Sequence, residues 1–317
     1  MQYVIGIDIG GTNLKMGAVA PDGKILLSVK KKPPHDKRGV IKNIIRFIEG
    51  ARGSLKNDTM IAVGIGAAGT ILHDSGIISQ SPNLPELNGM NLKDELAKEI
   101  TSPIFIDNDA NTFAIGEGWL GSARGYKNYC CLTLGTGVGG GIVLNGKILR
   151  GSDGTAGEVG HIVVEPKGLP CGCGSRGCLE VYASATGLVR SAKQGFQNIL
   201  AKGLRKSCNN NPENVSPEII AKLARDGDIF CRNLFKKIGT YLGIVITDLV
   251  NLLNMELIVI GGGLSGAGDL FLKMAEEEMQ KRALKVPCKR ARIVTAECEN
   301  AGIVGAAHMA LRGVDAI

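Results

Sequence analysis

The chain has 317 residues, of which 44% are hydrophobic and 21% charged, a composition typical of a globular protein long enough for two domains. The formal net charge is +7, but the lysines and arginines are dispersed, which argues against a nucleic-acid partner. Polar residues interrupt the most apolar stretch, 242–260, so we expect no membrane-spanning segment. The low aromatic share and the 45 glycines favour an α/β protein with many tight strand ends.

The first part of the sequence alternates between apolar strands and helical segments. It opens on a strand at 3–9, and the Pro-Asp-Gly turn at 21–23 then joins two β-rich segments into a hairpin. The further elements expected are a helix at 40–51, a strand at 60–70, a short helix at 91–100 and a strand at 102–109. This order predicts an antiparallel ribbon that continues by alternation of strands and helices.

The pattern of the N-terminus returns in the middle of the chain. Near Tyr129 the sequence again reads strand, glycine turn, strand, turn, strand, as in a duplicated fold. The elements expected after it are helices at 185–204, 217–226 and 229–253, a strand from Leu257, a helix at 269–284, a strand at 291–296 and a helix from Ala301. With hinges near Gly121 and Gly302, we expect one domain of 1–120 completed by 302–317, and a second of 121–301.

Four potential metal ligands lie close together in the sequence: His161, Cys171, Cys173 and Cys178. Three thiolates and one imidazole complete a tetrahedral zinc shell, and a shell with no open position is structural rather than catalytic. The alternatives are a pair of disulfides or reduced thiols in the core. We expect zinc, because glycines around the cysteines free the backbone to wrap a small ion, and we expect the pinned loop to present the flanking Glu158 and Glu180 to a substrate.

The remaining cysteines indicate the compartment. The total of nine is odd, and the six outside the cluster are scattered without the density of a secreted disulfide scaffold. The N-terminus carries no basic segment and reaches Asp8 too early for a signal peptide. We therefore expect a cytoplasmic protein.

Three glycine-rich turns directly follow strands, at 10–12, 135–141 and 261–263. Because glycine has no Cβ, successive backbone N–H groups in such turns can surround phosphate oxygens. Any one of them alone is consistent with a plain tight turn. Together, with Asp8 and Thr12 beside the first, they indicate a nucleotide site. The G-x-G-x-x-G runs do not open a helix, which argues against a dinucleotide-binding dehydrogenase.

In combination, these motifs resemble those of the ROK family (repressors, open reading frames and sugar kinases), within the sugar kinase and actin-like ATPase superfamily. The similar segments cover nearly the whole chain: IGIDIGGTNLK, SPNLP, DNDAN, LGTGVGGGIV, GEVGH, CGCGSRGCLE and LIVIGGGLS. The resemblance implies a two-domain α/β fold of the actin-like ATPase type with a ribonuclease-H-like core, ATP in the cleft between the domains, and phosphoryl transfer to a sugar hydroxyl.

The resemblance also implies roles for individual residues around the sugar. Asp109 matches the family's general base, which accepts the proton of the attacking hydroxyl, and it can also stabilise a helix N-terminus. The other residues expected to contact the sugar are Asn83, Asn108, Glu158, His161 and Glu180. His161 would serve twice, with one ring nitrogen on zinc and the other directed outward.

On the nucleotide side, Asp8 would orient Mg²⁺ through water. The residues expected around the phosphates and the adenosine are Gly10, Gly11, Thr12, Lys15, Gly135, Thr136, Gly137, Gly262 and Gly263. Catalysis by positioning and charge neutralisation needs little else from the protein.

Glucose is the expected substrate, because the residues that match the family's grip on the sugar ring are all present. Many glucokinases of the family carry an aromatic residue where this chain has Pro85, Glu86 and Leu87, so an N-acetylmannosamine kinase, or a kinase of another N-acetylhexosamine, is the alternative. A more distant alternative is a ROK-type sugar-responsive transcriptional regulator. Such a regulator carries a DNA-binding module ahead of its phosphate-binding strand, whereas that strand begins here within a few residues of Met1. Many relatives are homodimers or homotetramers, and we expect the same here.

Overall fold

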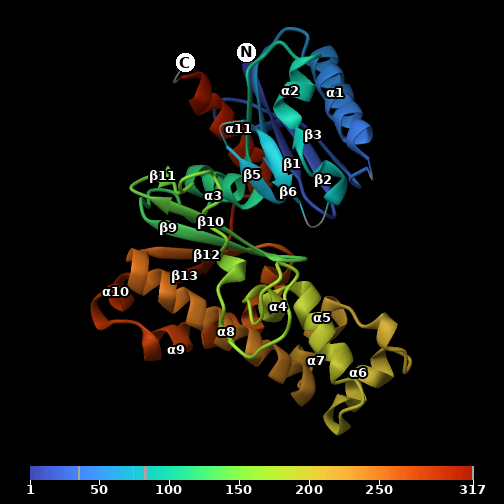
Figure 1. Ribbon diagram of the computed structural model, residues 1–317, viewed down its shortest axis with the longest axis vertical. Coiled ribbons are helices and arrows are strands. Elements are labelled where there is room, and N and C mark those ends of the chain that lie inside the picture. The colour runs from blue at the N-terminus through green and yellow to red at the C-terminus, as the bar shows by residue number, and fades with distance from the viewer. Residues whose placement is uncertain (35, 74, 82–83, 316–317) are drawn as a thin grey trace. The chain divides into compact units, whose positions relative to one another are not determined.

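The computed structural model describes residues 1–34, 36–73, 75–81 and 84–315. The chain divides into two compact units (Figure 1). Unit 1 contains Met1–Lys127, Gly141–Gly157 and Ala296–Ile317, and unit 2 contains Asn128–Gly140 and Glu158–Thr295.

Unit 1 is built on a mixed sheet with the strand order β3-β2-β1-β4-β8. These strands are β1 (Gln2–Ile9), β2 (Leu14–Val19), β3 (Ile25–Lys31), β4 (Thr59–Ala67) and β8 (Ile104–Asn108). The first three form the expected antiparallel ribbon, and β1, β4 and β8 run parallel. A small separate sheet contains β5 (Thr70–Leu72), β6 (Ile77–Gln80) and β7 (Met90–Asn91).

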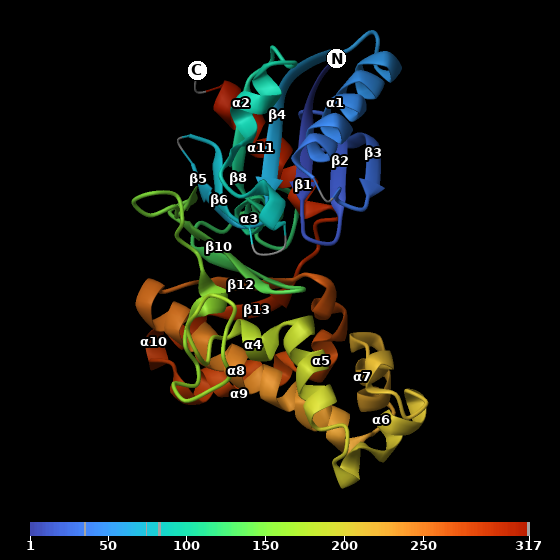
Figure 2. The ribbon, with the colours of Figure 1, turned by 45° about the vertical axis from the view of Figure 1, so that its right-hand side comes forward.

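Helices cover both faces of the larger sheet of unit 1 (Figure 2). They are α1 (Lys37–Ser54), α2 (Leu92–Ala97), α3 (Asp109–Leu120) and α11 (Ala301–Val314), with a 3₁₀ turn, η1, at Pro85–Leu87. Side chains alternate along β1, as a strand requires. Ile5 and Ile7 belong to the apolar core that includes α1, whereas Val4 packs in the core formed with α11. The α11 helix begins at Ala301, as expected from the sequence.

A second five-stranded sheet has the order β11-β10-β9-β12-β13. Its strands are β9 (Tyr129–Leu134), β10 (Val138–Leu144), β11 (Lys147–Ile148), β12 (Leu257–Gly261) and β13 (Arg292–Thr295). The β9, β12 and β13 strands are parallel, and β10 pairs with β11 in the antiparallel direction. This order repeats that of the first sheet strand for strand, which confirms the duplication predicted from the sequence.

Unit 2 is rich in helices. They are α4 (Glu180–Ala183), α5 (Ala185–Gln194), α6 (Lys202–Ser207), α7 (Pro217–Arg225), α8 (Ile229–Leu253), α9 (Leu272–Arg282) and α10 (Lys285–Arg290), with 3₁₀ turns η2 (Val159–His161), η3 (Ile199–Ala201), η4 (Pro212–Asn214) and η5 (Gly263–Leu270). Within the described ranges, no helix combines the length and apolarity needed to cross a membrane.

The prediction of one helix over 185–204 is wrong. The α5 helix ends at Gln194, and Gly195 follows as its cap, donating its N–H to the carbonyl of Ser191. A Cβ at Gly195 would lie 2.5 Å from the ring of Phe230, so glycine is required there by packing as well as favoured at a helix end. The sequence pattern missed this break because the apolar spacing continues across it.

His308 of α11 is a partly buried titratable group in unit 1. Its ring stacks on that of Trp119 in α3, with centroids 4.3 Å apart and planes inclined by 27°. Burial lowers the pKa of His308 to about 4, and the nearby Arg312 lowers it further while Asp315 opposes the shift. The unfolded chain therefore binds a proton at this residue at a higher pH than the folded chain does.

This difference predicts a loss of stability in mild acid. Between about pH 6.5 and 4, the unfolded state holds one more proton at His308, so the free energy of unfolding falls as the pH falls through that window. The slope should stay below about 1.4 kcal/mol per pH unit, because the ring is partly solvated. Urea unfolding of the wild type and of His308→Phe at pH 7 and pH 5 checks this: the variant should lose less stability on acidification, and equal losses would contradict the assignment.

Candidate active site and metal centre

The site residues expected from the sequence fall into two groups. One group lies in unit 1, at the end of β1, in the following turn and β2, and at the junction of β8 and α3. The other lies in unit 2, after β9 and β12 and in the segment from the start of η2 to the start of α4. Asn83, expected to contact a sugar, lies outside the described residues.

In unit 1, Asp8 stands near the end of β1 and pairs in register with Lys15 of β2. The Lys15 ammonium nitrogen is 3.4 Å from Oδ2 of Asp8. Burial raises the pKa of Asp8, and Lys15 only partly offsets that effect. A Cβ placed at Gly302 would be 2.8 Å from Oδ2 of Asp8, so the carboxylate lies against the first turn of α11. A partly buried, incompletely neutralised carboxylate of this kind is suited to a cation.

The first glycine turn follows Asp8. Gly10 donates its N–H to the carbonyl of Asn13 across the turn, at 2.9 Å. Gly11 is half-buried and Thr12 is exposed, so the hydroxyl of Thr12 is open to a ligand. The turn therefore leaves Gly11 and Thr12 accessible to a ligand.

The DNDAN segment lies at the same sheet edge. Asp8 pairs with Gly66 of β4, and Gly66 pairs with Asp107 of β8, so the two aspartates stand in one row across the sheet. Asn108 ends β8 and Asp109 begins α3. The helix N-terminal position expected for Asp109 is therefore confirmed.

The side chain of Asn108 has a structural task that the sequence analysis did not foresee. Its Oδ1 accepts the backbone N–H groups of Ala110 and Asn111, at 2.8 and 3.2 Å, and so caps α3. Its Nδ2 donates to the carbonyl of Gly69 at 3.0 Å. Asn108 thus fixes the direction in which the chain enters α3 at Asp109.

Asp107 is a further polar residue of this group that sequence reasoning missed. It is 1% exposed, and its carboxylate is paired with Arg150. The signal in the sequence is the first aspartate of DNDAN at the end of an apolar strand, because a charge is seldom buried there without a partner.

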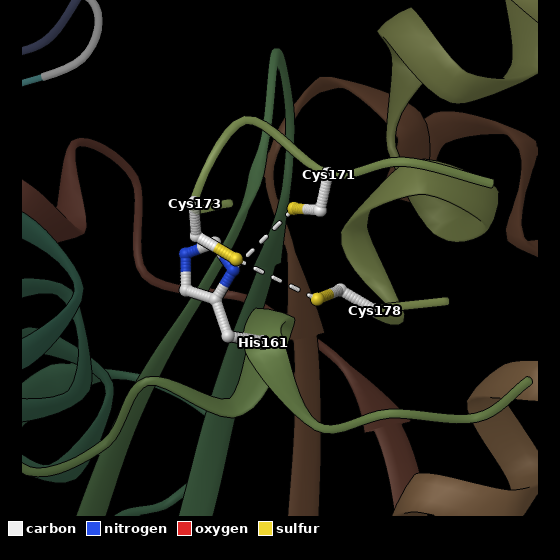
Figure 3. A group of neighbouring side chains, drawn as sticks. All are labelled: His161, Cys171, Cys173 and Cys178. Atoms are coloured by element: carbon white, nitrogen blue, oxygen red, sulfur yellow. Dashed lines mark hydrogen bonds between the residues drawn. The ribbon is translucent and has the colours of Figure 1, made fainter. Parts of the chain in front are cut away.

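In unit 2, the side chains of the predicted metal ligands converge on one point (Figure 3). The ligand atoms of His161, Cys171, Cys173 and Cys178 all lie within 4.8 Å of one another. The Sγ atoms of Cys173 and Cys178 are 3.7 Å apart, and Sγ of Cys171 is 3.7 Å from Nδ1 of His161.

These distances bear on the disulfide and zinc interpretations of the cysteines. A disulfide holds its sulfurs about 2 Å apart, and none of the nine cysteines, all of which lie within the described ranges, forms one, which argues against the disulfide alternative. A tetrahedron with zinc–sulfur bonds of about 2.3 Å has edges of roughly 3.8 Å. The sulfur spacing matches that edge, and three thiolates with one imidazole are a donor set suited to zinc.

The carboxylates that flank the cluster are electrostatically linked to it. Nε2 of His161, the nitrogen not directed to the cysteines, is 3.9 Å from Oε2 of Glu158. Burial raises the pKa of Glu158, an effect that His161 opposes and Glu180 reinforces. Glu158 keeps about half of its side-chain surface exposed, at 52%, so a polar ligand can reach it.

Glu180 also organises the second glycine turn. Its Oε2 accepts the backbone N–H of Val138 at 3.0 Å, and a Cβ at Gly137 would lie 2.3 Å from the same oxygen. Gly135 donates its N–H to the carbonyl of Gly137. A side chain at position 137 would therefore displace the Glu180 carboxylate from this contact, a reason for glycine that the motif alone did not reveal. Thr136 is exposed at the tip of the turn.

The third glycine turn packs on the first strand of its own sheet. Gly262 has a φ of 83°, and a Cβ there would be 2.4 Å from the carbonyl oxygen of Leu134 at the end of β9. Side chains are excluded on both grounds. Gly263 follows as the first residue of η5.

Comparisons with known proteins identify the family of the chain. The model of the ROK family matches residues 4–312. A glucokinase from Thermotoga maritima is 37% identical over 310 residues, which cover 96% of each chain. The crystal structure of a ROK family glucokinase from Streptomyces griseus in complex with glucose and AMPPNP is similar, with a TM-score of 0.85, 35% identity and coverage of 98% of this chain and 100% of that one. A xylose repressor from Caldicellulosiruptor bescii is 30% identical and covers 88% of this chain, which spans 70% of the repressor.

The chain belongs to the ROK family. The fold predicted from the sequence, a two-part α/β structure of the actin-like ATPase type, is confirmed by the repeated sheets and by the similarity to the glucokinase structure.

The metal centre leads to a test that needs no substrate. Cys173→Ser replaces a thiolate with a poor zinc ligand, so zinc should fall well below one ion per chain and the melting temperature should drop. Metal analysis and thermal unfolding measure both effects. Cys288→Ser, at a partly buried cysteine outside the cluster, is the control and should keep its zinc. Full zinc retention in Cys173→Ser would exclude a four-ligand site.

Proposed function

We propose that the protein transfers the γ-phosphoryl group of ATP to glucose and forms glucose 6-phosphate. The observation that carries this proposal is the similarity to a glucokinase from Thermotoga maritima over 96% of both chains. The related structure from Streptomyces griseus contains glucose and an ATP analogue, which supports the same pair of substrates here.

Asp109 is the proposed general base. As the first residue of α3 it has its backbone fixed by the helix and by the Asn108 cap. Its carboxylate accepts the proton of the glucose 6-hydroxyl while that oxygen attacks the γ-phosphorus, and ADP leaves with the electrons of the broken bond. The helix N-terminus stabilises the ionised carboxylate before the transfer.

The residues proposed to contact the sugar hydroxyls are Asn83, Asn108, Glu158, His161 and Glu180. The metal contributes by fixing η2 and the start of α4, where Glu158, His161 and Glu180 are anchored. With Nδ1 of His161 directed to the metal, Nε2 is left to donate toward the sugar or Glu158. Holding acceptors in place before binding reduces the entropy that the protein loses on binding the sugar.

Asp8 and the glycine turns are proposed for the nucleotide. Asp8 would hold Mg²⁺ through water, because it offers a hard oxygen ligand whose buried charge Lys15 only partly offsets. The magnesium ion, when bound, neutralises charge on the phosphates. The backbone N–H groups of the glycine turns and Lys15 would surround the phosphates, and Gly262 and Gly263 would face the adenosine.

The absence of disulfides among the nine cysteines, all within the described ranges, supports a reducing, cytoplasmic environment. We also propose a homodimer or homotetramer, and light scattering would measure its mass.

Asp109→Asn is the direct test of the base. The amide keeps the shape of the side chain but does not accept the proton, so kcat should fall by about 100-fold or more while KM for glucose changes little. Steady-state kinetics with a coupled ADP assay measure both constants. An unchanged kcat would show that Asp109 is not the base.

The choice of sugar is tested with a panel. Coupled ATP-consumption assays with glucose, mannose, fructose, allose, N-acetylmannosamine and N-acetylglucosamine should give the highest kcat/KM for glucose. A higher value for N-acetylmannosamine would assign the chain to the alternative that Pro85, Glu86 and Leu87 raised. A gel-shift assay with salt titration covers the regulator: specific, salt-sensitive DNA binding without turnover of any sugar would replace the kinase assignment.

A further inference from the structure

Asp107 and Arg150 form an ion pair in unit 1. Asp107 lies just ahead of the proposed base in the sequence. Asp107 is the residue two positions ahead of Asp109, and Arg150 follows β11, 43 residues further along the chain. Nε and Nη2 of Arg150 lie 2.9 and 2.8 Å from Oδ2 of Asp107. The side chain of Asp107 is 2% exposed and that of Arg150 is 29% exposed.

The other oxygen of the same carboxylate is also fully engaged. Oδ1 of Asp107 accepts the backbone N–H of Asn108 at 2.8 Å and the Nδ2 of Asn111 at 2.8 Å. Each oxygen therefore receives two donors, which uses the hydrogen-bonding capacity of a carboxylate. One of those donors is the backbone amide that leads into Asp109, and another is a side chain in the first turn of α3.

We propose that Arg150 is a positioning residue for phosphoryl transfer: by fixing the carboxylate of Asp107, it sets the place of the Asn108–Asp109 backbone and so of the general base. This inference rests on the proposed function and adds a residue from a distant part of the sequence to the same site.

The packing around α3 supports the proposed control of the Asn108–Asp109 backbone by this ion pair. A Cβ at Gly66 would meet Oγ1 of Thr112 at 2.2 Å, and a Cβ at Gly141 would meet the carbonyl oxygen of Ala110 at 2.4 Å. These two close contacts, one with the Thr112 side chain and one with the Ala110 backbone, fix the first turn of α3 from β4 and from β10. The entry to the turn, at Asn108, is held by hydrogen bonds instead, and Asp107 is the acceptor that links this entry to the end of β8.

The arrangement depends on a guanidinium group. Two nitrogens in a rigid fork converge on one carboxylate oxygen and fix its orientation, whereas a lysine ammonium is a single point charge on a flexible stem. Removal of Arg150 leaves a buried carboxylate without its cation, a state that strongly favours rearrangement of Asp107. A displacement of a catalytic group by about 1 Å lowers turnover by roughly 100-fold.

Kinetics of Arg150→Ala and Arg150→Lys test the proposal. In Arg150→Ala, kcat should fall by about 10- to 100-fold while KM for ATP changes less than threefold, and Arg150→Lys should recover only part of the loss. Millimolar guanidinium added to Arg150→Ala should restore part of kcat, because the partly exposed site admits the ion. A general weakening of the fold would not respond to guanidinium in this way. Arg282→Ala, which removes an exposed ion pair with Glu278 on α9, is the matched control and should keep wild-type kcat.

A double-mutant cycle adds a second readout. If Arg150 acts through Asp107, then Asp107→Asn together with Arg150→Ala should lower kcat no more than the worse single substitution does. Additive losses would overturn the proposal, and so would wild-type kcat in a folded Arg150→Ala protein. Failure of the proposed function gives a different result, namely a wild-type protein that does not phosphorylate glucose; the same variants are then measured with the sugar that the panel selects.

Discussion

The close approach of α11 to the sheet and to α3 is the constraint on which unit 1 depends. Cβ atoms at Gly6 of β1 and Gly64 of β4 would lie about 2 Å from carbonyl oxygens of α11, at 2.1 and 1.9 Å. A Cβ at Gly305 of α11 would likewise lie only 1.7 Å from the carbonyl oxygen of Thr112 in α3. Only glycine allows backbones to approach so closely. The first turn of α11 thereby reaches Asp8, and the first turn of α3 comes to rest against β4.

The sequence allowed most of the fold to be predicted because the same strand and turn pattern occurs twice. The long helix over 229–253 was also predictable, since its apolar spacing is continuous and an aspartate precedes it as a cap. The purpose of the glycines was only partly predictable. Those in turns stand out by their motifs, whereas Gly6 and Gly64 lie inside strands, where they look like weak β formers until the helix that covers them is known.

The metal ligands could be predicted from the sequence, whereas the long-range partners of the site residues could not. The metal ligands are local in sequence, so their spacing alone predicted a cluster that the structure contains. Residues that pair across a long stretch of sequence have no characteristic spacing from which the pairing could be predicted. The pairing of Asp107 with Arg150, and the contact of Glu180 with the Val138 amide across 42 residues, arise only when separate loops fold against the sheets. Chemistry-bearing residues were thus identified more readily than the residues that hold them in position.

Asp8 and Asp107, which lie in a single row of the sheet, illustrate the difference between a residue suited to bind a ligand and one that holds its neighbours in position. Both are carboxylates at the ends of parallel strands, and Gly66 pairs with each of them. Asp107 receives donors on both oxygens from Asn108, Asn111 and Arg150, so the protein itself satisfies its charge. Burial instead raises the pKa of Asp8 despite Lys15, so its ionised form is favoured further when a cation arrives. The satisfied carboxylate is suited to hold the backbone still, and the unsatisfied one is suited to bind a ligand.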